Sequence, residues 1–252
     1  DVDRIDPIDM PELERWVLHR LAELDNVVRD GYRKFDFQGV FQALFQFATV
    51  DLSAFYFDIR KDVLYCDGDT LERRSARTVL DLLYHRLTTW LAPILVFTME
   101  EVWLERHPGD DASVHLQDMP DTPFDWIDAD LAAKWSVLRK VRRVVTGALE
   151  VQRRDKVIGS SLEAAPVVYV DAQTADLLDD LNLADLFITS DVAVDTGTAP
   201  ANAFTLDDVD GVAAVFAKAH GEKCARCWKI LPDVGQHSHA AVCGRCDDAL
   251  TE

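Results

Sequence analysis

The sequence predicts a mainly α-helical protein: an antiparallel helical bundle, then a small α/β junction, then a C-terminal zinc ribbon or knuckle held by four cysteines. Three observations lead to this fold class. Apolar residues recur with a helical period in four successive segments of the first 110 residues. Short β-rich runs flank a helical segment between residues 166 and 194. Two Cys-x2-Cys pairs follow. We expect domains at residues 1–110, 111–210 and 211–252.

The first two helices of the bundle are the longest apolar patterns in the sequence. Helix one is predicted over residues 10–30, with Asp9 as its N-cap and Gly31 as its end. Helix two is predicted to be central, because only a deep helix–helix interface can bury so broad an apolar stripe. That stripe comprises Phe37, Val40, Phe41, Leu44, Phe45, Ala48, Leu52, Phe55 and Ile59.

Turn residues delimit the other two helices. An Asp-Gly-Asp turn breaks the helical period over residues 61–69, and Thr70 then caps a third helix over residues 71–90. Pro93 closes that helix, and a fourth extends over residues 94–105 before His107-Pro108-Gly109 stops it. Residues 110–125 are predicted to form a loop that leads out of the bundle.

The junction is predicted to begin with a long helix over residues 125–149, which carries basic residues on its polar face. A strand over residues 166–170, a short acidic helix over 174–181 and a second strand over 186–194 follow. A last strand, over residues 211–220, leads into the first cysteine pair. These elements predict a small α/β domain.

The four clustered cysteines have the spacing of a structural zinc site. Each pair can hold the metal from one tight turn, and the fifteen residues between the pairs form the connecting loop. Gly244 is expected to give the second turn a positive φ. Four thiolates leave no open position for water, so we expect one structural zinc ion. The predicted ligands are Cys224, Cys227, Cys243 and Cys246.

Other uses of these cysteines fit less well. Two disulfides or a redox Cys-x2-Cys motif would suit another compartment, because the sequence shows no apolar leader and Cys66 stands alone in a charged context. His237 or His239, in the connecting loop, could replace one cysteine as ligand. Cys66 is expected to be a small, partly buried filler.

Charge and motifs limit the function. The formal net charge of −19 argues by itself against nucleic acid as a partner. The charge is uneven, however: residues 166–211 hold ten aspartates and no lysine or arginine, whereas residues 139–156 hold seven basic residues. The longest uninterrupted apolar run, near residues 91–99, is too short to cross a membrane. The sequence lacks a phosphate-binding glycine loop, a Gly-x-Ser-x-Gly elbow and a His-Glu-x-x-His motif, so no catalytic residue is assigned.

Seven short blocks, in order along the chain, resemble the C-terminal part of bacterial isoleucyl-tRNA synthetases. Together they extend over nearly the whole sequence, and the terminal four-cysteine site favours this family over the valine enzymes. The blocks are DLSAFY (51–56), KDVLYC (61–66), ERRSA (72–76), LAPIL (91–95), FTMEEVW (97–103), KVIGSSLEA (156–164) and KCARCW (223–228).

The resemblance implies an anticodon-binding bundle, a junction, and a zinc domain that helps to hold the tRNA. It implies isoleucine tRNA and the remainder of the synthetase chain as partners, with the protein a cytoplasmic monomer and no membrane contact. The His-x-Gly-His and Lys-Met-Ser-Lys-Ser motifs of the family's catalytic fold are absent. ATP and magnesium would therefore act only in a catalytic domain outside this chain, and the fragment alone should not form isoleucyl adenylate.

Basic and aromatic side chains are the candidate tRNA contacts. Trp228 directly follows a predicted zinc ligand, where it could stack on an unpaired base, cover the zinc or pack on the bundle. Each arginine or lysine could instead form an ion pair with Asp62, Glu72 or Asp81. The candidates are Arg60, Lys61, Arg73, Arg74, Arg77, Arg139, Arg143, Trp228 and Lys229.

A second hypothesis remains open on the residues alone. The chain could be a stand-alone helical module whose zinc tail binds a protein. The aspartate-rich segment is expected to face solvent under either hypothesis.

Overall fold

The computed structural model of the chain describes residues 4–109 and 111–252, which divide into two compact units. The helical unit holds the described residues of Asp1–Asp58 and Asp69–Ala129. The C-terminal unit holds Ile59–Gly68 and Asp130–Glu252. Asp110, the predicted start of the loop and end of the first domain, lies outside the described residues, as do residues 1–3. The predicted division into residues 1–110, 111–210 and 211–252 stays a prediction.

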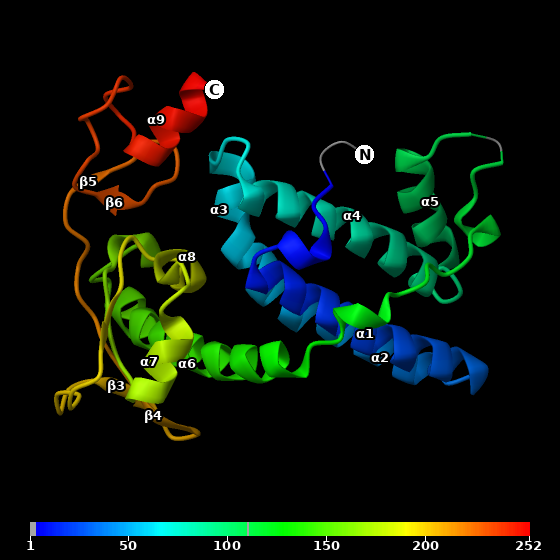
Figure 1. Cartoon of the computed structure of the whole chain (residues 1–252), viewed down its shortest axis with the longest axis horizontal. Helices are drawn as coiled ribbons and strands as arrows, with labels where there is room; N and C mark the ends of the chain where they lie inside the picture. Colours follow the sequence, from blue (N-terminus) through cyan, green and yellow to red (C-terminus); the bar gives the residue numbers. More distant parts are fainter. Residues whose placement is uncertain (1–3, 110) are drawn as a thin grey trace. The chain divides into compact units, whose positions relative to one another are not determined.

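The first long helix, α1, extends over Glu12–Arg33 and follows a short 3-10 turn, η1, over Pro7–Asp9 (Figure 1). The predicted cap and end of this helix were wrong. Pro11 occupies the N-cap position without a side-chain hydrogen bond, and the helix continues through Gly31. Gly31 is needed for close packing instead, because an added Cβ would lie 2.4 Å from Cγ2 of Val40 in the next helix. The turn between the two helices contains Phe35 with a φ of 59°.

The second long helix is continuous from Phe37 to Cys66. It begins as α2 (Phe37–Gln46), continues as a π-helix, η2 (Phe47–Phe57), and ends as α3 (Asp58–Cys66). Residues 61–66, predicted to be a turn, are thus helical. The predicted stripe was only half right, since Phe37, Phe41 and Phe45 are exposed. The three phenylalanines lie in α2, and the π-helical turns of η2 begin after them, so a constant period of 3.6 residues does not describe the whole helix.

This second helix is, among the described residues, the one long and apolar enough to cross a membrane. It replaces residues 91–99 as the most apolar candidate. Length and composition are weak evidence, because the core helix of a folded domain passes the same test. In the most apolar 18-residue stretch of this helix, 39% is buried in the structure.

Two further helices complete the helical unit. Thr70 caps α4 (Leu71–Leu91) as predicted, accepting a hydrogen bond from the amide of Arg73 at 3.2 Å. The helix α5 (Val96–Arg106) follows a turn around Pro93. The loop that comes next carries two 3-10 turns, η3 (Val114–Leu116) and η4 (Phe124–Trp126). Asp125 lies in the second of these turns and does not begin a helix as predicted.

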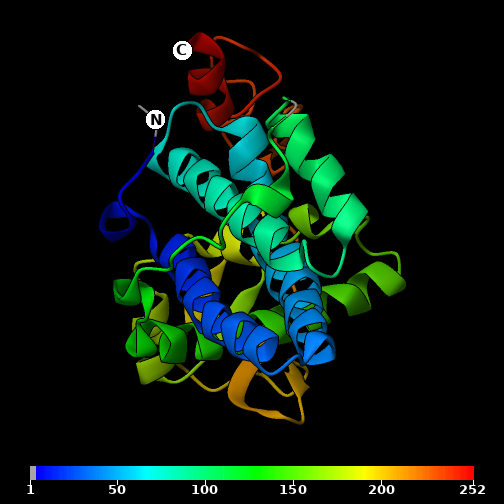
Figure 2. The same cartoon turned by 90° about the vertical axis from the view of Figure 1, so that its right-hand side faces the viewer.

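The core of the helical unit lies between α1, the second helix and α4. Figure 2 shows α1 (blue) along the second helix. Trp16 of α1 packs edge-on against Phe55, with ring centroids 5.3 Å apart. The buried hydroxyl of Tyr56 donates a hydrogen bond to Glu14 at 3.1 Å. These contacts confirm the expected helix–helix interface.

The C-terminal unit is built on a long helix and a four-stranded sheet. The helix, α6, extends over Ala129–Arg154. The strands are β1 (Val167–Tyr169), β2 (Ala193–Asp195), β3 (Phe204–Leu206) and β4 (Val209–Val215), in the order β2-β1-β4-β3. β1 and β2 are parallel, and the other pairs are antiparallel. The helix and sheet touch at Gly147, where an added Cβ would lie 2.6 Å from the ring of Phe204.

Two short helices connect β1 to β2: α7 (Ala172–Leu178) and α8 (Leu183–Phe187). The predicted strand over residues 186–194 was therefore wrong for its first residues, where Asn182 caps α8. The strand β3 was not predicted. Parallel strands need such a crossover, which explains the helices between two short β runs.

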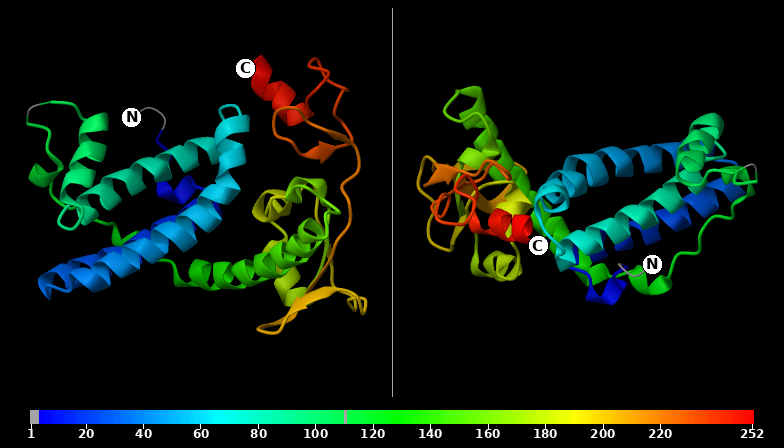
Figure 3. Two further views of the ribbon diagram at one scale, coloured as in Figure 1. Left: turned by 180° about the vertical axis from the view of Figure 1, so that it is seen from behind. Right: turned by 90° about the horizontal axis from the view of Figure 1, so that it is seen from above.

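The last segment is the finger, which we define as residues 221–251. An extended stretch, orange in the left panel of Figure 3, leads to it from β4. The finger contains a two-stranded sheet of β5 (Glu222–Lys223) and β6 (Ile230–Leu231) and a final helix, α9 (Gly244–Thr251). The fold class is confirmed: a mainly helical chain with small sheets and a C-terminal four-cysteine cluster.

Candidate metal centre

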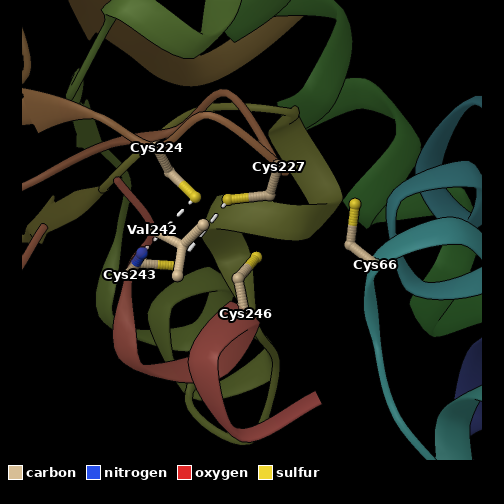
Figure 4. Packing of buried hydrophobic residues seen from close by; sticks show 6 residues of the cluster. All are labelled: Cys66, Cys224, Cys227, Val242, Cys243 and Cys246. Atoms are coloured by element: carbon tan, nitrogen blue, oxygen red, sulfur yellow. Dashed lines mark hydrogen bonds between the residues drawn. The ribbon is translucent and has the colours of Figure 1, made fainter. Parts of the chain in front are cut away.

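The four predicted cysteine ligands come together in the finger. One pair lies between β5 and β6, and the other at the start of α9 (Figure 4). All four are buried, and their Sγ atoms lie within 4.8 Å of one another. Sγ of Cys227 is 3.8 Å from Sγ of Cys243. Thiolates at about 2.3 Å from one zinc ion lie about 3.8 Å apart in a tetrahedron, so the cluster has the size of a zinc site.

Electrostatics in the cluster also favour a cation. Burial raises the pKa of Cys227, and it raises the pKa of Cys246 to about 11, with the charge of Cys243 acting in the same direction. Burial also acts to raise the pKa of Cys224, but backbone amides, with those of Cys227 and Cys243 foremost, outweigh it and lower that pKa to about 6. Four thiolates this close together repel one another, and a divalent ion compensates them. The residues therefore fit one structural zinc ion.

The alternative uses of these residues are not supported. All five cysteines are free, so the two disulfides are excluded in this structure. Each loop histidine contacts a carboxylate and lies outside the thiol cluster: His237 is 3.0 Å from Asp233, and His239 is 2.7 Å from Asp247. The Asp233 carboxylate also accepts a hydrogen bond from the amide of Gly244 at 2.8 Å, and that bond lowers its pKa.

The backbone of the two cysteine turns differs from the expectation. Gly244 begins α9 and does not have a positive φ. It fits for another reason, since an added Cβ would lie 3.1 Å from the ring of His237. In the first turn it is Trp228 that adopts a left-handed conformation, with a φ of 66°. A non-glycine residue pays about 1–2 kcal/mol for this conformation.

Two arginines of the finger bind the end of α3, which belongs to the same unit. Arg226 donates to the carbonyl oxygens of Cys66 and Tyr65, the latter at 3.5 Å. Arg245 pairs with Asp62 at 2.6 Å and with Asp67 at 3.1 Å. We call these contacts the arginine clasp.

The clasp was missed in the sequence, although a signal exists. Each cysteine pair has the form Cys-x-Arg-Cys, with arginine at the third position. Cys66 lies in the same cluster as a buried residue, as expected of a filler, and its Sγ is 3.7 Å from the carbonyl oxygen of Arg226. The repeated arginine therefore fastens both turns of the finger to one helix end.

The candidate tRNA contacts differ in exposure. Arg60 is 8% exposed, and Lys229 is 9% exposed and paired with Asp185 at 2.5 Å. Both were predicted as tRNA contacts, but their burial leaves little surface for a phosphate. Lys61 is exposed at the end of the second helix.

The remaining arginines lie on helices. On α4, Arg77 is exposed, Arg73 is half-buried, and the side chain of Arg74 lies 3.9 Å from Asp69. On α6, Arg139 is half-buried, and Arg143 is exposed and paired with Asp208 at 2.9 Å.

Trp228 is the most exposed aromatic side chain of the finger, at 60%. The ammonium group of Lys223 lies 5.7 Å from the centre of its ring. The ring is thus largely open to solvent, whereas the four cysteines are buried together with Val242 and Cys66.

Comparison with known proteins gives two family matches. The anticodon-binding domain of tRNA ligase matches residues 14–169, and the zinc finger found in FPG and IleRS matches residues 221–249. The second match agrees with the four-cysteine cluster, and together they support one structural zinc ion.

Curated relatives extend the similarity. The chain is 68% identical to an isoleucine–tRNA ligase of Ruegeria pomeroyi, over 99% of the chain and 26% of that protein. It is 56% identical to that of Brucella abortus, over 90% of the chain and 24% of the relative, and 54% identical to that of Agrobacterium fabrum, with the same coverage. The chain thus spans about a quarter of the length of these relatives. Since the first family match covers more than half of its residues, the chain belongs to the family of anticodon-binding domains of tRNA ligases.

Proposed function

We propose that this chain is the tRNA-binding C-terminal portion of an isoleucine–tRNA ligase and that it recognises the anticodon region of isoleucine tRNA. The observation that carries the proposal is the anticodon-binding family match over residues 14–169. The identity to isoleucine–tRNA ligases supports the choice of tRNA. We further propose that the whole protein is a cytoplasmic monomer.

The chemical steps belong to the part of the enzyme outside this chain. There, ATP and isoleucine would form isoleucyl adenylate with magnesium, and the aminoacyl group would pass to the tRNA. We assign this chain no catalytic residue. Its contribution is binding energy, which orients the tRNA for a reaction at a distant site.

Local groups explain how a chain with a net charge of −19 can bind a polyanion. Unpaired bases stack well on exposed aromatic rings, and Trp228 presents such a ring beside the ammonium group of Lys223. The phosphates of the tRNA would bind to those predicted basic contacts that are at least partly exposed, which are Lys61, Arg73, Arg74, Arg77, Arg139 and Arg143.

The aspartates of residues 166–211 are proposed to face away from the RNA. Asp191 lies just before the exposed strand β2 and Asp195 is the last residue of that strand, and neither has a nearby lysine or arginine in sequence. A phosphate backbone would be repelled there.

The test is the affinity of the purified chain for isoleucine tRNA and for an unrelated tRNA across a salt series. Trp228→Ala is expected to weaken binding of isoleucine tRNA about five- to a hundredfold, because stacking on one base contributes about 1–3 kcal/mol. One zinc ion per chain should remain. Phe124→Ala is the matched control, since it removes an aromatic ring that is 89% exposed in the helical unit.

Unchanged affinity in a zinc-loaded Trp228→Ala variant would reject the stacking role. Failure of the wild-type chain to bind either tRNA would reject the proposed function and favour a protein partner for the finger.

A further inference from the structure

A basic hollow lies at the C-terminal end of α6, and none of its lining residues is among the predicted tRNA contacts. Its volume is 620 Å³. Three cationic side chains line it, together with two acids and a short apolar loop. The lining residues are Glu150, Arg153, Arg154, Lys156, Val157, Ile158, Gly159 and Glu163.

The two acids of the hollow are already engaged. Glu150 pairs with Arg153 at 2.6 Å, and Glu163 accepts a hydrogen bond from the amide of Gly159 at 3.3 Å. Arg154 pairs with Asp155 at 3.3 Å. The exposed ammonium group of Lys156 has no ion-pair partner within the described part of the chain. The lining residues thus carry three cations against two acids, and Lys156 is the cation for which the described part of the chain supplies no ion pair.

The backbone holds Lys156 in an unusual place. The amide of Lys156 donates to the carbonyl oxygen of Arg153 at 3.0 Å, and the amide of Val157 donates to that of Gln152 at 2.9 Å. These two bonds form a Schellman motif, which ends the helix and puts its C′ residue in the left-handed region. That residue is Lys156, with a φ of 58°.

Glycine is the usual residue at this position, because a Cβ costs about 1–2 kcal/mol in the left-handed conformation. The turn itself needs no side chain. The lysine is thus kept at a cost in stability, and strain of this kind is concentrated at binding sites. What it adds is a positive charge beside Arg153 and Arg154 in the hollow.

We propose that this hollow binds a phosphodiester group of the tRNA backbone, with Lys156 as the principal contact. The inference rests on the proposed function, which supplies RNA as the partner. A phosphate needs neither a base-reading group nor an aromatic surface, and a lysine ammonium group binds it as a point charge. The contact would be sequence-independent and sensitive to salt.

Lys156→Gly separates binding from folding. It removes the cation and relieves the left-handed strain, so the thermal midpoint of the chain should stay equal or rise. The affinity of the full chain for isoleucine tRNA should fall about three- to tenfold near 0.1 M salt. The slope of log affinity against log salt should become shallower by about one unit, as expected for one lost phosphate contact.

Two further variants complete the experiment. Lys156→Asn also tolerates the left-handed conformation without a charge, and should show the same loss if the glycine variant folds poorly. Lys34→Ala removes one positive charge from the helical unit, where Lys34 pairs with Asp30 at 2.6 Å. It should leave the affinity within about twofold of the wild type, because an exposed, paired lysine contributes little.

The outcomes are distinct. If the wild type binds tRNA and Lys156→Gly binds it equally well, the hollow is not a phosphate site, while the proposed function stands. A loss of affinity with an unchanged salt slope would also overturn the phosphate assignment. If the wild type binds no tRNA, the proposed function fails and this inference fails with it.

Discussion

The helical unit and the finger bury their side chains by different means. In the helical unit, large apolar residues such as Leu21 and Trp90 are fully buried between long helices. In the finger, the buried cluster consists of the four ligand cysteines, Val242 and the neighbouring Cys66, with Leu231 and Val234 partly buried. A core of this size cannot offset the conformational entropy of the loop. One region is therefore held by the hydrophobic effect and the other by metal ligation.

The largest expected effect is the loss of zinc. Chelation or Cys224→Ser should unfold the finger, because structural zinc contributes about 10–16 kcal/mol to folding in small zinc domains. The helical signal in circular dichroism should change little, since α1, the second helix and α4 keep their own core. Metal analysis measures whether zinc is bound, and limited proteolysis measures whether the finger is folded.

The matched variant is Leu21→Ala, in the core of the helical unit. It should destabilise that unit by about 2–5 kcal/mol in urea while one zinc ion per chain is retained. A protease-resistant finger in metal-free Cys224→Ser, or zinc loss in Leu21→Ala, would contradict the division between the two regions.

The same division explains what could be predicted from the sequence. The cysteine spacing specified the metal cluster, because ligand chemistry is local and each pair sits in one turn. The Thr70 cap is also local, because it is a hydrogen bond from the amide of Arg73 to a hydroxyl only three residues earlier. These features depend on a few neighbouring residues, so the sequence alone predicts them.

Features that depend on distant contacts were missed. Phe41 and Phe45 are exposed on α2, ahead of the π-helical turns of η2, because their burial depends on which elements pack against α2, and a periodic pattern does not reveal that. The burial of Lys229 depends on Asp185, 44 residues away. Left-handed Lys156 and Trp228 could not be predicted either, because glycine is the residue that normally marks such positions.

A smaller effect is expected from the arginine clasp, which links the finger to α3 within the C-terminal unit. Arg245→Ala should leave Asp62 and Asp67 close together without their cation. The side chain of Arg245 is 34% exposed, so the cost is about 1–2 kcal/mol, less than for a fully buried pair. Zinc content should not change, but the finger should become more sensitive to protease.

The control for this variant is Arg143→Ala, which breaks an exposed pair with Asp208 in the same unit. It should change stability by less than about 0.5 kcal/mol. Equal protease sensitivity of the two variants would show that the clasp does not hold the finger.

The smallest effect concerns acid, which should separate the two regions. Burial acts to raise the pKa of Asp81 in the helical unit, but hydrogen bonds and charges from Arg4 and Arg106 outweigh it and hold that pKa below its usual value. A depressed carboxyl pKa stabilises the folded state above the unfolded pKa of about 3.9, and the contribution is lost as the pH falls through the folded value. The finger should fail at higher pH, because protons compete with zinc for the thiolates.

Asp81→Asn tests this order of events. Its two arginine partners are about half exposed, so the loss at pH 7 should be only about 0.5–1 kcal/mol. Below pH 4 the stabilities of the variant and the wild type should converge. The wild-type carboxyl of Asp81 is then mostly protonated in the unfolded state, and it becomes protonated in the folded state as the pH falls further. Urea unfolding of the helical unit at pH 7, 5 and 3, with zinc content measured in parallel, follows both regions. Zinc retained at a pH where the helical unit has already unfolded would reverse the predicted order and show that the metal cluster is the more acid-resistant of the two.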